Sequence, residues 1–223
     1  MMRKIALLLA ALTLSVTALS ARPYPDRYSP YQHGYRWYFS LQGGPAILLT
    51  DNIQTFGQYG KAMDMLCWHA AASFGYNFSD AWDLRISGSY ANNAGAMLPY
   101  GGFYPYYYFA AQLFADIALN YNALAEYNIP FNLKTYIGLG GAYTHNFTEV
   151  EHPFQELPAY NIVPGVRLGG IIEIDYKSGF GWFLDLGAEA FLDRYDGQVA
   201  GSPVDFAFKL SFGVIYHLPL IRK

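Results

Sequence analysis

The sequence predicts an all-β fold, an eight-stranded antiparallel transmembrane β-barrel, and three observations predict it. The 223-residue chain is 53% hydrophobic and 18% aromatic, but only 14% of its residues are charged. After residue 21 it has no run of about 18 uncharged apolar residues, which a membrane-spanning helix would need. Apolar and polar residues instead alternate strictly in one segment after another, as in strands with two different faces.

The composition also excludes other classes of protein. Soluble domains carry on average about 25% charged residues, and disordered chains combine low hydrophobicity with high net charge. This chain has fewer charged residues than an average soluble domain, and it is too hydrophobic, with a formal net charge of only −3, for a disordered chain. The sequence pI of about 5.9 argues against a basic nucleic-acid-binding protein.

Residues 1–21 are predicted to be a cleaved secretory signal peptide. Arg3 and Lys4 precede an apolar run of signal length, and small residues follow the run at Ala18, Ser20 and Ala21. An N-terminal membrane anchor is the alternative, but the run is short for one. The only cysteine is Cys67, so no internal disulfide is expected in the exported chain.

The remaining chain is predicted to be one domain. Residues 22–34, rich in Pro and Tyr, are expected to form a periplasmic N-terminal arm. Residues 35–218 carry the alternating pattern and are assigned to the barrel, and residues 219–223 to a C-terminal tail.

Eight alternating stretches define the expected strands, near residues 35–49, 66–78, 82–91, 106–121, 131–144, 160–176, 181–193 and 203–218. The breaks near 50–65, 92–105, 145–159 and 194–202 are long. Those near 79–81 and 177–180 are short, and the break near 122–130 is intermediate. Long loops at one end and short turns at the other are typical of outer-membrane barrels.

Each of the first four stretches has apolar residues at every second position. In the first these are Tyr35, Trp37, Phe39, Leu41, Gly43 and Pro45. In the second they are Leu66, Trp68, Ala70, Ala72, Phe74 and Tyr76. In the third they are Trp82, Leu84, Ile86, Gly88 and Tyr90. In the fourth they are Tyr107, Phe109, Ala111, Leu113, Ala115, Ile117, Leu119 and Tyr121.

The last four stretches repeat the pattern. In the fifth the residues are Phe131, Leu133, Thr135, Ile137, Leu139, Gly141 and Tyr143. In the sixth they are Ile162, Pro164, Val166, Leu168, Gly170, Ile172, Ile174 and Tyr176. In the seventh they are Trp182, Leu184, Leu186, Ala188, Ala190 and Leu192, and in the eighth Val204, Phe206, Phe208, Leu210, Phe212, Val214 and Tyr216. No charged residue occurs on this face.

The opposite face carries the charges of the strands. Small and charged residues fit the narrow interior of an eight-stranded barrel. A soluble lipocalin-like barrel would instead have the apolar face inside, but the many large apolar residues do not fit there. The apolar face is therefore expected to face lipid, where Lys or Arg near the midplane would cost about 2–4 kcal/mol. The predicted lumen charge network consists of Arg36, Asp83, Arg85, Asp116, Lys134, Arg167, Glu173, Asp175, Asp185, Glu189, Asp205 and Lys209.

Aromatic residues gather at the strand ends, with aliphatic residues between them. Two aromatic girdles around an aliphatic band are typical of the two interfaces of a bilayer. The predicted girdle residues are Trp37, Trp68, Tyr76, Trp82, Tyr90, Phe109, Tyr121, Phe131, Tyr143, Tyr176, Trp182 and Tyr216.

Three segments carry a family resemblance: WYFSLQGG at 37–44, DIALNYN at 116–122 and YIGLGGAY at 136–143. They resemble the eight-stranded outer-membrane β-barrel family of the OmpA/OmpX type, over about residues 35–218. The resemblance implies a bacterial outer-membrane location but no particular activity, because this scaffold hosts several functions. No C-terminal peptidoglycan-binding domain is expected, and Tyr216 is a candidate for the terminal aromatic assembly signal.

The lumen charges are expected to pair and to occlude the barrel, since an unpaired buried charge costs several kcal/mol. A narrow path for small solutes is the alternative. His145 and His152 lie near Glu149, Glu151 and Glu156 in one long loop, but their spacing matches no metal site. We therefore predict no metal and no cofactor. Cys67, His69 and His217 are expected to fill the barrel.

An enzyme is the weaker alternative. A nucleophile, a base and an orienting carboxylate are available in Ser202, His145 and Asp51 or Asp196, but no nucleophile elbow is present. Lipid A or phospholipid acyl transfer or hydrolysis would be the reaction.

The favoured function is a non-enzymatic envelope protein, structural or surface-binding through its extracellular loops, and the first alternative is a narrow pore or a transporter of small hydrophobic molecules. The expected partners are outer-membrane lipid and lipopolysaccharide, the barrel-assembly machinery, and an extracellular glycan or protein, with no nucleic acid.

Overall fold

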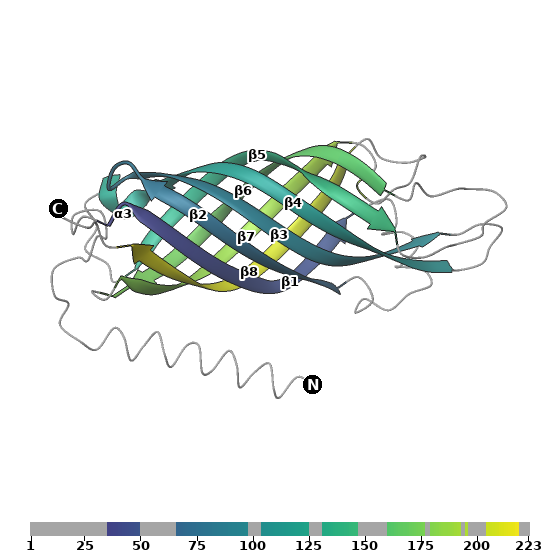
Figure 1. Ribbon diagram of the computed structural model, residues 1–223, viewed down its shortest axis with the longest axis horizontal. Coiled ribbons are helices and arrows are strands. Elements are labelled where there is room, and N and C mark those ends of the chain that lie inside the picture. Colours follow the sequence, from purple (N-terminus) through teal and green to yellow (C-terminus); the bar gives the residue numbers. More distant parts are fainter. Residues whose placement is uncertain are drawn as a thin grey trace, which may run out of the picture.

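The computed structural model describes residues 35–49, 66–97, 104–124, 131–146, 160–176, 179–192, 195 and 204–218. Its eight strands form one closed, strongly tilted barrel (Figure 1). They are β1 (Trp37–Leu49), β2 (Leu66–Asn77), β3 (Trp82–Met97), β4 (Tyr104–Asn120), β5 (Asn132–Asn146), β6 (Tyr160–Asp175), β7 (Phe180–Leu192) and β8 (Val204–Leu218). The predicted fold class is confirmed. Within the described segments, no helix is long and apolar enough to cross a membrane.

Every strand pairs in antiparallel fashion with its neighbour in sequence, and β1 also pairs with β8 to close the barrel. The β1–β8 register runs from Trp37↔Leu218 to Gly43↔Phe212 and resumes at Ala46↔Lys209. The interruption covers Gly44 and Pro45, and Pro45 has no backbone N–H to donate to a ladder. Closure leaves no free sheet edge, so the strands satisfy their backbone hydrogen bonds internally.

The two short turns are fixed by local hydrogen bonds. In the β2–β3 turn, the backbone N–H of Trp82 donates to the side-chain oxygen of Ser79 at 3.0 Å. In the β6–β7 turn, Gly179 has a positive φ of 82° and its N–H donates to the carbonyl of Tyr176. Glycine adopts this conformation without the steric cost that a side chain would bring.

The β4–β5 connection contains one turn of helix that the sequence pattern did not predict, α3 (Tyr121–Leu124). The side-chain oxygen of Asn120 accepts the N–H of Asn122 at 3.1 Å. The Asn122 side-chain oxygen in turn accepts the N–H of Leu133 at 3.4 Å. Asparagine side chains that bond nearby backbone groups favour such compact turns.

The β3–β4 hairpin is longer than predicted. The expected strands ended at 91 and began at 106, whereas β3 continues to Met97 and β4 begins at Tyr104, with Met97 paired to Tyr104. The Gly- and Asn-containing segment 92–97 resembles a loop in isolation, but it is continuously paired to the aromatic start of β4. The hairpin extends past the neighbouring strand ends (Figure 1).

The two faces of the wall differ as the alternation predicted. Burial alternates residue by residue along β8, with Phe206, Phe208 and Phe212 exposed on the outside. The outer face is rich in exposed Leu, Ile, Val and aromatic side chains, whereas most of the inner face is buried. The predicted signal peptide (1–21), N-terminal arm (22–34) and C-terminal tail (219–223) lie outside the described residues.

Candidate functional site in the barrel lumen

The structure places ten of the twelve predicted lumen charges in the buried interior: Asp83, Arg85, Asp116, Lys134, Arg167, Glu173, Asp185, Glu189, Asp205 and Lys209. The carboxylate of Asp175 lies at the short-turn end and is almost fully covered. Arg36 differs from the expectation. It precedes β1 and is half-buried, and its guanidinium donates to the hydroxyl of Tyr76 at 3.2 Å, so it belongs to the rim of the barrel.

The middle of the lumen is occupied by a buried ion cluster around Asp116. The Nε of Arg85 donates to one carboxylate oxygen of Asp116 at 2.8 Å, and the Nε of Arg167 donates to the other at 2.6 Å. Arg85 also lies 3.7 Å from Asp185, which accepts the hydroxyl of Tyr136 at 2.9 Å. Two arginines and two aspartates thus balance in charge at this level, as buried charges must.

A second ion cluster lies at the short-turn end. The ammonium of Lys134 is 2.9 Å from Glu173 and 3.6 Å from Asp83. The hydroxyl of Tyr38 donates to Asp83 at 2.8 Å. Each carboxylate therefore has a donor, and side chains from β1, β3, β5 and β6 are tied together across the barrel.

Glu173, Asp175 and His217 have potential metal-ligand atoms within 4.8 Å of one another. These atoms already have partners: the Nε2 of His217 is 3.1 Å from Asp175, and Asn132 donates to Asp175 at 2.8 Å. Glu173 is paired with Lys134. A cation here would compete with an existing lysine, so we assign the group to the ion cluster rather than to a metal.

A third ion cluster lies toward the long-loop end, where the ammonium of Lys209 is 2.7 Å from Glu189 and also contacts the side-chain oxygen of Gln112. Nearby, the Nε2 of His69 is 2.8 Å from the hydroxyl of Ser211. The three ion clusters, from the short-turn end to the long-loop end, therefore join side chains across the lumen by hydrogen bonds and ion pairs.

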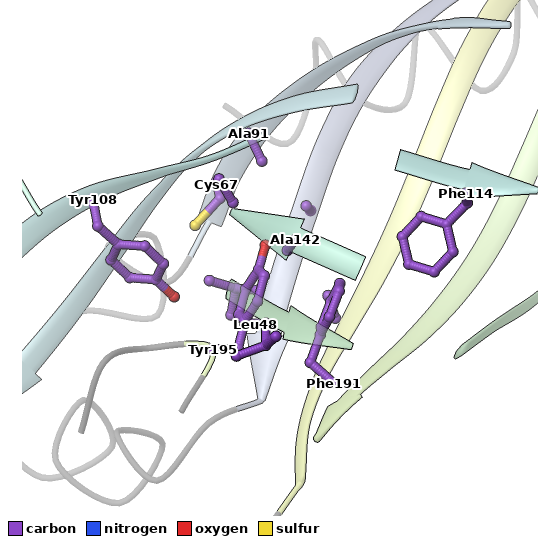
Figure 2. Close-up of a cluster of buried hydrophobic side chains, with 12 residues drawn as sticks. Leu48, Cys67, Ala91, Tyr108, Phe114, Ala142, Phe191 and Tyr195 are labelled. Carbon is purple, nitrogen blue, oxygen red and sulfur yellow. The ribbon is translucent and has the colours of Figure 1, made fainter. Parts of the chain in front are cut away.

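Between the third cluster and the long-loop end the lumen is apolar. Tyr195, which follows β7 in the chain, lies in this part of the lumen. Its side chain is fully buried, and its backbone N–H donates to Asp205 at 2.9 Å. Its ring stacks on Phe191, with 4.1 Å between centroids (Figure 2). Burial raises the pKa of Tyr195, so the hydroxyl is neutral. The sequence pattern missed this residue because it lies outside every alternating stretch.

Large aromatic rings inside the barrel were also missed, because the expected filling was charged and small residues. Five of these rings each lie beside a glycine that is the direct partner on the neighbouring strand, where a Cβ would meet the ring or hydroxyl. The pairs are Tyr38↔Gly75, Phe114↔Gly140, Tyr136↔Gly169, Phe183↔Gly213 and Phe191↔Gly165. Glycines on the inner face of one strand, opposite aromatic residues on the inner face of the next, are the sequence signal that could have predicted these buried rings.

All twelve predicted girdle residues lie on the exposed or half-exposed side of the wall. At the short-turn end, Trp37 stacks on Phe74 with 5.1 Å between centroids. At the long-loop end, Tyr90 stacks on Phe109 at 5.7 Å. The two ends therefore each carry contacting rings, with aliphatic side chains between them.

The candidate metal and catalytic residues are only partly described. His145 packs against aromatic rings, 5.4 Å from Phe109 and 6.5 Å from Tyr143 between centroids. The other candidates lie outside the described residues: His152, Glu149, Glu151, Glu156, Ser202, Asp51 and Asp196. The lumenal candidates Cys67, His69 and His217 are all buried.

Comparison with known proteins gives a fold but no close relative. No protein-family model and no curated protein sequence matches the chain. Among solved structures, Neisserial surface protein A is similar with a TM-score of 0.52 and 14% identity, over 82% of this chain and 97% of that one. A major outer membrane protein from Thermus thermophilus also gives 0.52, with 13% identity over 82% of this chain and 99% of that one. The resemblance stated from the sequence is thus confirmed for the fold, and the chain has the architecture of the eight-stranded outer-membrane β-barrels.

Proposed function

We propose that the protein is an integral outer-membrane barrel that acts without catalysis, as a structural or surface-binding protein of the bacterial envelope. The observation that carries this proposal is the division between the two faces of the wall. Leu113 and Leu139 are 63% and 69% exposed on an outer face lined with other apolar side chains. An apolar surface that encircles a barrel fits lipid as its solvent, because closure satisfies the backbone without water.

The filled lumen favours a closed barrel over a pore. The three ion clusters described above join side chains on opposite walls, and rings such as Phe114 and Phe183 are buried between them. The two small cavities at the short-turn end are lined by Lys134, Asp83 and Glu173, which are already paired. This arrangement supports neither a narrow pore nor a transporter of small hydrophobic molecules.

In this proposal the short turns face the periplasm and the long connections face outward. Outer-membrane lipid and lipopolysaccharide surround the girdles, and the assembly machinery inserts the chain after export. A glycan or protein ligand would bind the long connections, most of which lie outside the described residues, so this part rests on their composition. Neisserial surface protein A, which is similar in fold, is named as a surface protein.

The location and the closed lumen are tested together. Cell fractionation should recover the protein in the outer membrane, and the purified protein should give no steady conductance in planar bilayers, with an open porin as positive control. Steady conductance would favour the pore, and recovery in the soluble periplasm would refute the membrane location. A deletion strain assayed for envelope permeability and surface binding tests the envelope role.

A further inference from the structure

The long-loop half of the lumen is walled by small side chains. Cys67 and Val163 contribute to this wall, together with one alanine from each of five strands: Ala46, Ala91, Ala110, Ala142 and Ala207. All of them are buried in the same cluster as Tyr195 (Figure 2). Leu48 and Phe114 also belong to this cluster, but most of the wall is small and leaves a space inside the barrel, which the ring of Tyr195 occupies.

Two other rings position the ring of Tyr195. Phe191 stacks on it almost in parallel, with an interplanar angle of 11° and 4.1 Å between centroids. Tyr108 approaches edge-on, at 79° and 6.1 Å. Stacked and edge-to-face neighbours are the preferred geometries for an aromatic guest. The space therefore selects a flat ring rather than a branched aliphatic group.

At the other end of the space, polar side chains surround the hydroxyl of Tyr195. The Nε2 of Gln112 donates to the hydroxyl oxygen of Tyr195 at 2.8 Å. The orientation of the Gln112 amide is fixed from its other side, where its oxygen accepts from Ser89 at 2.6 Å and from the ammonium of Lys209. An ammonium has no acceptor, so the amide atom beside it must be the oxygen. Gln112 thus presents a donor to whatever group lies at the Tyr195 hydroxyl.

Asn93 completes this polar end. Its Nδ2 is 3.2 Å from the Tyr195 hydroxyl, whereas its Oδ1 is buried with no hydrogen-bond partner in the part of the chain that the structure describes. Amide nitrogen and oxygen exchange places on a 180° rotation. In that orientation Asn93 accepts the hydroxyl proton while Gln112 donates to its oxygen. The two amides therefore match a phenolic hydroxyl, which is both donor and acceptor.

We infer that this half of the lumen is a binding site for a phenol-class ring, which is filled by the chain's own Tyr195 and which accepts an external hydroxyaromatic molecule when that side chain is removed. A tethered ring has a high effective concentration and excludes free ligand from the wild-type site. The inference does not depend on the proposed envelope role, because the site lies inside the barrel and is measurable in detergent micelles.

The test uses p-cresol, which reproduces the tyrosine side chain, with the full chain carrying Tyr195→Ala. Saturation-transfer NMR should detect p-cresol bound to the variant but not to wild type. Toluene should bind at least about tenfold more weakly, because it leaves the donor of Gln112 and the acceptor of Asn93 unpaired. No p-cresol binding to the folded variant, or equal binding of p-cresol and toluene, would overturn the inference.

Two matched variants separate the site from nonspecific uptake. Tyr90→Ala removes a tyrosine from the exposed outer face, so p-cresol should not bind it above wild type. Adding Gln112→Leu to Tyr195→Ala should reduce the preference for p-cresol over toluene. Binding to Tyr90→Ala as strong as to Tyr195→Ala would contradict the assignment, as would an unchanged preference in the double variant.

Cys67 provides a second readout because it is the only cysteine in the chain and lies in the same buried cluster. Maleimide should label Cys67 faster in Tyr195→Ala than in wild type, and p-cresol should restore the slow rate. If Tyr195→Ala does not fold, Tyr195→Phe keeps the ring and removes only the hydroxyl. Its urea unfolding midpoint should fall while that of Tyr90→Phe does not; an unchanged midpoint would count against the hydroxyl anchor.

Discussion

Asp116 shows how one buried carboxylate bridges two cations in the barrel interior. Its side chain is 0% exposed and is bonded to both Arg85 and Arg167. Each guanidinium also lies over a ring, 4.5 Å from Tyr136 and 4.6 Å from Phe114. Two buried cations are tolerated here because Asp116 accepts hydrogen bonds from both, and Asp185, 3.7 Å from Arg85, supplies the second negative charge.

Replacing Asp116 with alanine should destabilise the protein strongly. Two buried guanidinium groups would lose their shared partner, which costs about 3–5 kcal/mol for a broken buried pair. The measurement is equilibrium urea unfolding in micelles. Asp80→Ala in the β2–β3 turn is the control and should cost less than about 1 kcal/mol. Similar losses for the two variants would mean that Asp116 has no special place in the interior.

Sequence parity alone placed Asp116 inside, because it lies on the charged side of a strictly alternating stretch. Parity could not place Tyr195, whose position depends on the path of the chain after β7 and on the small-walled space opposite it. A residue outside regular structure has no periodicity, so only tertiary contacts decide whether it is buried.

At the scale of strands, the interior is built from cross-strand pairs of one ring and one glycine. Tyr38 and Gly75 face each other on β1 and β2, and Tyr136 and Gly169 do so on β5 and β6. The glycine leaves its neighbour room to lie flat against the wall. A ring that covers a glycine on the next strand stabilises sheet pairing that glycine alone would weaken.

Gly75→Ala should therefore be costly although it adds only a methyl group. The new Cβ would overlap the ring of Tyr38, and overpacking of this kind costs about 1–3 kcal/mol. Gly88→Ala is the matched control, because the atom nearest to its new Cβ is the carbonyl oxygen of Gln112 at 3.9 Å, an ordinary contact. We expect the control to lose less than about 1 kcal/mol in the same urea titration.

A double-mutant cycle identifies the cause. In a Tyr38→Ala background the ring is gone, so Gly75→Ala should cost less than it does in wild type. An undiminished cost would place the strain in the backbone and not in the pairing of ring and glycine.

The strand boundaries show where local pattern fails at this scale. Six breaks fell close to their predicted positions, but the break predicted at 92–105 is largely strand. Glycine and asparagine favour turns in isolation, whereas the paired backbone of β3 and β4 overrides that preference. The helical turn α3 was not predicted either, because the side-chain hydrogen bonds of Asn120 and Asn122 that define it leave no periodic pattern in the sequence.

At the scale of the whole molecule, the outer face determines the solvent in which the barrel is stable. Leu113 lies in mid-strand on that face, beside Gly88 and Gly141 of the neighbouring strands. If lipid covers this face, Leu113→Arg should make folding into bilayers less favourable by about 2–4 kcal/mol. Leu113→Phe should leave it nearly unchanged, since it keeps an apolar side chain.

The measurement is reversible folding into phosphatidylcholine vesicles for both variants. An arginine variant as stable as the phenylalanine variant would contradict a lipid-facing Leu113. Gln112→Arg, on the inner face, would be a poor control, because Gln112 contacts the ammonium of Lys209 and a second cation there would be repelled.

The eight strands, their two faces and the side on which the charges lie can all be predicted from the sequence. These properties follow from period-two alternation, which is local and repeats along each strand. Only the tertiary structure decided which charges pair, which ring covers which glycine, and that Tyr195 fills the apolar half of the lumen. Those contacts join residues far apart in the chain, and their partners are set by strand register and barrel closure, which no local pattern contains.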